Sequence, residues 1–115
     1  MNQTFDMSLH RTPRLSEIEQ ELMRWEEQLE DWAKRIPWTS PEQRKDSMIT
    51  AKFLRKLVAE CWIHTLAAKS RGGDPMDSSA FRARRVYRQI SQYGPSLSDN
   101  MESRLPESVP NLVAA

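Results

Sequence analysis

The amino-acid sequence predicts an all-α fold: a three-helix bundle built on an antiparallel helical hairpin, with flexible N- and C-terminal tails. Apolar residues near the N-terminus keep a strict three-four spacing, which is the period of a helix stripe that packs on other helices. The chain also holds only 3 Gly and no run of alternating β-branched residues. A β-rich fold therefore has no support.

One domain accounts for the chain of 115 residues. Its 4 Trp, 2 Tyr and 3 Phe, with 38% hydrophobic residues, are enough for a modest core. The flanks are too polar to join that core. We therefore assign residues 12–94 to the bundle, residues 1–11 to a flexible N-terminus and residues 95–115 to a flexible C-terminal tail.

The first helix is expected over residues 14–36. Thr12-Pro13 and Ser16-x-x-Glu19 are helix-start signals, and Pro37 follows the basic pair that ends the helix. Three heptads also suit a coiled coil, but two Trp are bulky for a two-stranded seam and favour a bundle core. The apolar stripe consists of Leu15, Ile18, Leu22, Trp25, Leu29, Trp32 and Ile36.

The second helix is expected over residues 41–70. It starts at Ser40-Pro41-Glu42-Gln43, which combines an N-cap, a first-turn proline and a capping-box glutamine. It ends before Gly72-Gly73. Because so few residues connect it to the first helix, the two helices must run antiparallel as a hairpin.

The third helix is expected over residues 75–93. Asp74-Pro75 or Asp77 begins it, and Gly94-Pro95 is a stop signal. Ser, Pro, Asp and Glu dominate the residues that follow, so we expect the chain to be flexible from residue 95 onward.

Catalytic, cofactor and metal sites are not expected. Cys61 is the only cysteine, so it cannot form an intramolecular disulfide or, with His10 and His64, a four-ligand zinc site. Cys61 and His64 are spaced i, i+3, but both fall in an apolar arc and no third polar group would orient the histidine. We interpret them as core residues. There is also no glycine-rich phosphate loop.

The sequence predicts a cytoplasmic protein that does not enter a membrane. No apolar run approaches the roughly 18 residues of a membrane span. Asp6 and His10 fall where a signal peptide would need an uninterrupted apolar stretch. A single cysteine also suits a reducing compartment.

Charges are sorted along the chain. Residues 13–36 carry four basic and seven acidic side chains, a net −3, whereas residues 41–94 carry eleven basic and five acidic side chains, a net +6. Four arginines and an aromatic ring share one arc of the third helix, and guanidinium groups with an adjacent ring are typical of nucleic-acid binding. This candidate set is Phe81, Arg82, Arg84, Arg85 and Arg88.

The sequence favours an ordinary structural interpretation of the same arc. Charge runs usually mark solvated helix faces. Phe81 would then fold back on the second helix, and the arginines would pair with the acidic first helix.

The C-terminal half of the second helix is apolar on its outer side as well, at Ala59, Ile63, Leu66 and Ala67. A helix that is apolar all round must be covered all round. We expect the third helix to cover this side, because it is already available within the chain. The alternative is a second subunit or a partner, whose interface would include Ile63 and Leu66.

The function expected from these features is a small non-enzymatic protein-interaction module, such as an adaptor, a chaperone-like subunit or an inhibitor. Its partner would be another protein or a second copy of the chain. The alternative is a small nucleic-acid-binding regulator of a virus or mobile element that uses the arginine-rich third helix.

Overall fold

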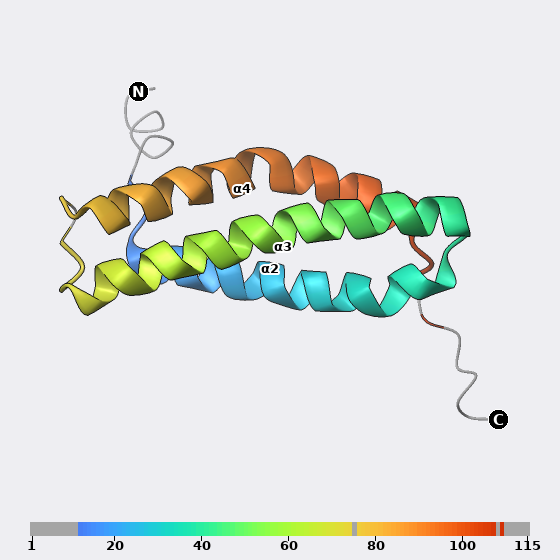
Figure 1. Cartoon of the computed structure of the whole chain (residues 1–115), viewed down its shortest axis with the longest axis horizontal. Coiled ribbons are helices and arrows are strands. Elements are labelled where there is room, and N and C mark those ends of the chain that lie inside the picture. Colours follow the sequence, from blue (N-terminus) through green and yellow to red (C-terminus); the bar gives the residue numbers. More distant parts are fainter. Residues whose placement is uncertain (1–11, 75, 108, 110–115) are drawn as a thin grey trace, which may run out of the picture.

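Three α-helices and one short 3-10 turn make up the computed structural model, which describes residues 12–74, 76–107 and 109. Within these residues there is no strand. The elements are α2 (Leu15–Arg35), η1 (Ile36–Trp38), α3 (Pro41–Ser70) and α4 (Ser78–Arg104). Successive helices run in opposite directions, and α3 lies between α2 and α4 in Figure 1. The predicted all-α bundle and its antiparallel hairpin are confirmed.

The starts of α3 and α4 follow predicted capping signals, whereas α2 begins at Leu15 with Arg14 as its N-cap, so neither Thr12 nor Ser16 caps it. The hydroxyl of Ser40 accepts a hydrogen bond from the backbone N–H of Gln43 at 3.3 Å, as predicted for α3. For α4 the cap is Asp77, whose carboxylate accepts from the backbone N–H of Ser79 at 3.2 Å. The third helix therefore begins at Ser78 rather than at residue 75.

The α3–α4 connection depends on two glycines. Gly72 and Gly73 have φ values of +92° and +72°, a backbone region that side chains with a Cβ rarely enter. The N–H of Gly73 donates to the carbonyl of Ala68 at 2.9 Å and closes the end of α3. The chain can then reverse over a few residues.

The stop expected at Gly94-Pro95 is wrong, because α4 continues through both residues to Arg104. Pro95 cannot donate to the carbonyl of Ser91, which costs a helix about 3 kcal/mol. Burial offsets this cost: Met101 and Leu105 lie beyond the proline and are 0% and 7% exposed. The helix arches near its middle (Figure 1).

The C-terminal tail is correspondingly shorter than predicted. Residues 95–104 are helical and Leu105 packs in the core, so the expected flexible segment is wrong for residues 95–105. Of the remaining residues of the predicted tail, 106, 107 and 109 are described and are not helical, whereas 108 and 110–115 lie outside the described residues, as does the predicted flexible segment 1–11.

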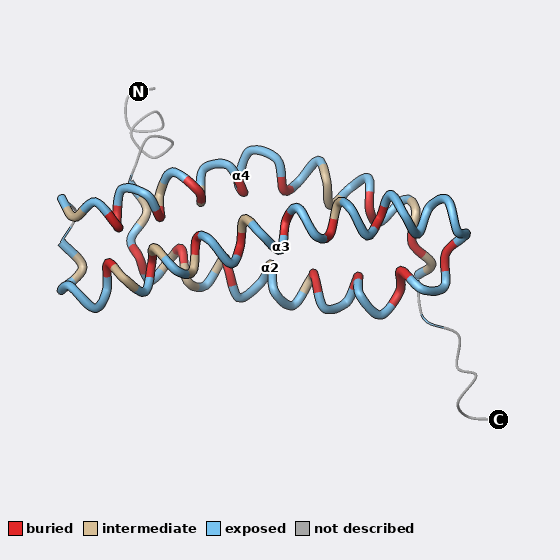
Figure 2. Tube along the Cα trace, viewed as in Figure 1, coloured by how far each residue is buried: buried red, intermediate tan, exposed pale blue. Residues whose placement is uncertain are grey.

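The predicted apolar stripe of α2 forms one side of the core. Six of its seven members are buried, and Trp25 is half-buried against the same cluster. Buried segments recur on the inward side of each helix in Figure 2. Trp25 and Trp32 meet edge to face, with ring centroids 6.4 Å apart and planes at 65°.

Trp25 also packs against the backbone of α4 at Gly94. A Cβ added to Gly94 would lie 2.4 Å from Trp25 Cζ2, closer than real side-chain contacts allow. The indole therefore fits only because position 94 has no side chain. This explains why a glycine stands inside a helix, where it is otherwise unfavourable.

Small side chains bring α3 and α4 close together on the other side of the core. Cys61 Sγ donates to the carbonyl of Ala83 at 3.3 Å, and the hydroxyl of Thr65 donates to the carbonyl of Cys61 at 2.7 Å. Burial raises the pKa of the Cys61 thiol to about 11, so the group stays neutral. Core packing, as predicted for this cysteine, is confirmed.

The Gly94 contact predicts a stability change of unusual sign. Gly→Ala inside a helix normally stabilises by about 1 kcal/mol. Here Gly94→Ala should lower the free energy of unfolding by about 1–2 kcal/mol, because the new methyl group would overlap the Trp25 indole. Denaturant unfolding monitored by circular dichroism measures the change.

Removal of the indole supplies the control. In a Trp25→Ala background the obstruction is gone, so Gly94→Ala should recover its ordinary stabilising effect. If Gly94→Ala stabilises the protein even with Trp25 present, the indole does not occupy the space beside Gly94.

Candidate functional site

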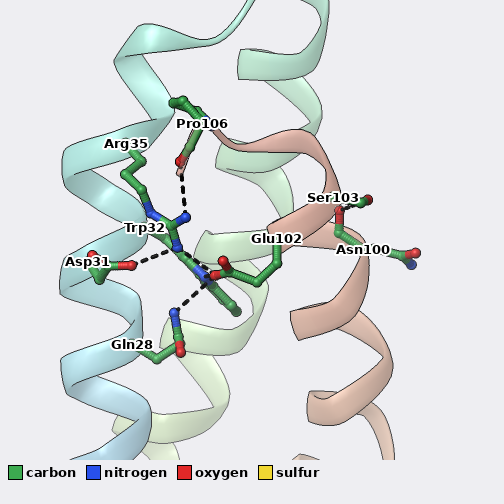
Figure 3. A network of polar contacts seen from close by, with 8 residues as sticks. All are labelled: Gln28, Asp31, Trp32, Arg35, Asn100, Glu102, Ser103 and Pro106. Carbon is green, nitrogen blue, oxygen red and sulfur yellow. Dashed lines mark hydrogen bonds and ion pairs between the residues drawn. The ribbon is translucent and has the colours of Figure 1, made fainter. Parts of the chain in front are cut away.

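A cluster of polar side chains joins the C-terminal ends of α2 and α4 (Figure 3). Glu102 Oε2 accepts from Trp32 Nε1 at 2.7 Å and from Arg35 Nη2 at 2.5 Å. It also accepts from Gln28 Nε2 at 3.3 Å. We call these four residues the Glu102 cluster. Three donors from α2 thus converge on one carboxylate oxygen of α4.

Arg35 extends the cluster beyond the end of α4. Its side chain is only 8% exposed, and its Nη1 donates to the carbonyl of Pro106 at 3.1 Å. Its Nη2 also lies 2.6 Å from Asp31 on the preceding turn of α2. Arg35 therefore binds the chain at Pro106 to α2, in a segment that the sequence predicts to be flexible.

The charges in this cluster are fixed near neutral pH. The hydrogen bond from Arg35 is the largest influence on Glu102 and lowers the pKa of its carboxyl, although burial opposes the shift. The same bond raises the pKa of Arg35. Neither group can exchange a proton near pH 7, so the cluster stabilises the fold and is unsuited to acid–base catalysis.

The prediction that both Cys61 and His64 are core residues is confirmed for Cys61 and wrong for His64, whose side chain is 21% exposed. Cys61 is fully buried and contacts α4, whereas His64 is on the rim of a shallow depression of about 370 Å³ between α3 and α4. His64 Nε2 lies 3.9 Å from Glu60 Oε2. The described residues contain no group of three or more His, Cys, Asp or Glu that could hold a metal ion.

The depression is bordered by two of the predicted arginines. Arg82 and Arg85 line it from α4, together with Val86 and Gln89, opposite the α3 residues Glu60 and His64. Arg82 and Arg85 are exposed, as is Arg88 one turn further along. Within the described part of the chain these three arginines form no ion pair or hydrogen bond.

The ordinary interpretation of this arc is wrong in both respects. The side chain of Phe81 is 67% exposed and does not fold back on α3. The arginines do not pair with acidic residues of α2. Arg84 does form a hydrogen bond, but to a backbone group: its Nε donates to the carbonyl of Pro13 at 3.0 Å, just before α2 begins.

The outward face of α3 is also uncovered. Ile63 and Leu66 are 66% and 53% exposed, so the expectation that the third helix covers them is wrong. The reason is the direction of approach: α4 packs on the side of α3 that carries Cys61, Thr65 and Ala68. That side is turned well away from Ile63 and Leu66 around the helix.

This outward face is longer than the two residues that the sequence singled out. Exposed residues follow it with the same three-four spacing that marks α2, and a search for that spacing would have found them. It consists of Lys45, Ile49, Lys52, Lys56, Ala59, Ile63 and Leu66, with Met48 and Arg55 along one edge.

The charges of α3 are sorted around its circumference. At 100° per residue, Lys52 and Lys56 fall on the outward face, whereas Glu42, Asp46 and Glu60 fall together on the edge toward α4. Within the described residues, Lys52, Arg55 and Lys56 form no ion pair. The outward face is therefore both apolar and positively charged.

Comparison of the chain with protein-family models, with curated proteins and with solved structures gives no match. Among the described residues, no helix is both long enough and apolar enough to cross a membrane.

The Glu102 cluster predicts a pH-dependent loss of stability. Glu102→Gln should lower the free energy of unfolding by about 1–2 kcal/mol at pH 7, because Arg35 loses a charged acceptor. Since the folded-state pKa of Glu102 lies below the ordinary 4.5, its contribution is present above pH 4.5 and is lost as the pH falls through the folded value. Thermal unfolding from pH 7 down to about pH 2 measures both effects.

Glu26→Gln is the matched control, because Glu26 is an exposed carboxylate of α2 without an ion pair in the described residues. It should change stability little at pH 7. The cluster does not hold α4 if Glu102→Gln and Glu26→Gln have the same effect.

Proposed function

We propose that this protein is a non-enzymatic helical interaction module whose outward α3 face binds an amphipathic helix of a partner protein. The observation that carries the proposal is the exposure of Ile49, Ile63 and Leu66 by 60%, 66% and 53% on a helix whose opposite face is already buried. When a helix has apolar residues on two faces and one of them is buried in its own bundle, the other is available to bind another chain.

The spacing of the face favours a helix as the occupant. From Ile49 to Leu66 the exposed positions alternate by three and four residues over about 26 Å of helix. A partner helix can follow such a stripe with its own apolar residues, as in helix-on-helix recognition. A peptide that binds by strand addition would instead need an open sheet edge, and the described residues contain no strand.

The charges favour an acidic partner. Lys52, Lys56 and Arg55 stand beside the apolar positions, so Glu or Asp on the flanks of a partner helix would meet opposite charge. The bundle already contains one pairing of this type: Lys69 Nζ of α3 lies 2.9 Å from Glu19 of α2. We therefore infer a partner helix of the same kind as α2, with an apolar stripe and acidic flanks.

Such binding without a reactive group fits an adaptor, a chaperone-like subunit or an inhibitor. We also propose a cytoplasmic location, which the single free cysteine is compatible with.

A designed peptide tests the proposal. A helix of about three heptads, with Leu at the three-four positions and Glu on the flanks, should bind the wild-type protein in fluorescence anisotropy. Ile63→Glu with Leu66→Glu should weaken this binding by about 10- to 100-fold, because an unpaired charge would be buried in the contact. Lys52→Glu with Lys56→Glu should weaken it too, and should strengthen binding of the same peptide with Lys flanks.

Met23→Glu is the matched control, since Met23 is 54% exposed but belongs to α2. It should leave peptide binding unchanged, and none of these surface variants should lower the melting temperature appreciably. Failure of the acidic peptide to bind at about 100 μM overturns the proposal. So does a wild-type dimer that the Ile63/Leu66 variant converts to a monomer, since the face would then serve self-association.

A further inference from the structure

We propose that α4 carries a second, separate binding site, which receives single-stranded nucleic acid on Phe81, Arg82, Arg85 and Arg88. The site includes the depression between α3 and α4, and it uses neither the outward face of α3 nor the Glu102 cluster.

The first support is an exposed ring among unpaired cations. Phe81 exposes 67% of its surface, and Arg85 lies one turn further along the same side of α4. Exposed aromatic side chains are stacking platforms for unpaired bases, and guanidinium groups bind phosphate oxygens through paired N–H donors. A base and a phosphate, the two groups that these side chains bind, occur together in every nucleotide of a single strand.

The second support is the depression itself. Arg82, Arg85 and Gln89 follow one another at i, i+3 and i+7, so all three side chains border the hollow from the same side of α4. The depression is shallow and open to solvent, with a volume of about 370 Å³, so a strand could cross it without entering a closed pocket. Five of its six lining residues carry hydrogen-bonding groups, as a sugar-phosphate requires.

Glu60 is the one acidic group on the depression, and it repels phosphate. Its carboxylate lies 3.9 Å from His64 Nε2, and Arg82 and Arg85 border the same hollow. The local charge is therefore positive even with Glu60 ionised. A strand would accordingly track the arginine side of the depression rather than the α3 side.

The geometry identifies which of the five predicted residues take part. Arg85 occupies the central position, one turn from Phe81 and Arg82 on one side and from Arg88 on the other. Arg84 differs from the other three, because its Nε donates to the carbonyl of Pro13 and its side chain is half-buried. We therefore assign phosphate binding to the three exposed arginines, Arg82, Arg85 and Arg88.

A single strand is favoured over a lipid surface by the distribution of apolar groups. Phe81 and Tyr93 are the large exposed apolar side chains of α4, and they stand about 18 Å apart along the helix. Membrane-surface helices instead present a continuous apolar face. One ring between arginines suits one stacked base.

Fluorescence anisotropy with a labelled oligouridylate, the matching oligothymidylate and a mixed-sequence duplex tests the site. Either single strand should bind more tightly than the duplex, and affinity should fall as salt rises from about 50 to 200 mM. Phe81→Ala should weaken single-strand binding by about 5- to 100-fold without changing the salt dependence. Arg85→Ala should weaken binding and reduce the salt slope by about 0.7.

Tyr93→Ala and Arg84→Ala are the controls, an exposed ring and an arginine of the same helix that lie outside the site. Both should leave single-strand binding and its salt slope unchanged. Thermal melts of Phe81→Ala and Arg85→Ala should match the wild type, since both side chains are exposed.

Two results overturn the proposal. One is single-strand binding no tighter than about 10 μM at physiological salt, which is within the range of non-specific adsorption. The other is a Phe81→Ala variant that keeps its affinity for single strands but loses affinity for phosphatidylserine vesicles, because the ring would then serve a membrane surface.

Discussion

The packing of the Trp25 indole on Gly94 sets how closely the middle of α4 approaches α2. An indole has to be accommodated between α2 and α4, and only a position without a Cβ lets the ring approach the α4 backbone this closely. With the indole packed against Gly94, the remaining turns of α4 lie alongside α2. Met101 and Leu105 can then enter the core, and Glu102 reaches the donors of α2. The absence of a Cβ at Gly94 thus permits α4 to continue through Pro95, and the burial of Met101 and Leu105 stabilises the ten residues that follow Gly94.

The same arrangement decides which surfaces stay free. The small residues of α3 and α4 fix their closest approach at Cys61 and Ala83, and the two indoles fill the wider space between α2 and α4. With α2 and α4 on two sides of α3, the third side keeps its exposed Ile63 and Leu66. Acidic residues predominate on α2 and basic residues on α3 and α4, so both proposed sites lie on helices with a positive net charge. Opposite charge would speed the approach of either partner.

The sequence predicted what local rules control. The apolar period of α2, the Ser40 cap and the Gly72-Gly73 turn depend on neighbouring residues, and all three are confirmed. The predicted helix end at Gly94-Pro95 is wrong because this pair ends a helix when only neighbouring residues count. Here the burial of Met101, two turns later, stabilises the continuation of α4. The sequence does not predict the Glu102 cluster, because Glu102 reaches α2 only when α4 continues past Pro95. The exposure of Phe81 and Ile63 depends on which side of α3 packs against α4. The residue pattern of one helix does not determine that contact, so the exposure could not be predicted from it. The recurrence of apolar residues at 90, 97, 101 and 105 is the one sequence signal that could have extended α4.

The position of Cys61 has a consequence for how the bundle opens. Its sulfur is fully buried between α3 and α4, and its raised pKa leaves almost no thiolate at neutral pH. An alkylating reagent can therefore attack it only when those two helices separate. Because it is the sole cysteine, the rate of labelling reports that one separation without interference from any other site. Fraying of the helix ends would leave the rate of alkylation unchanged. The rate therefore reports the separation of α3 and α4 and is insensitive to motions elsewhere in the chain.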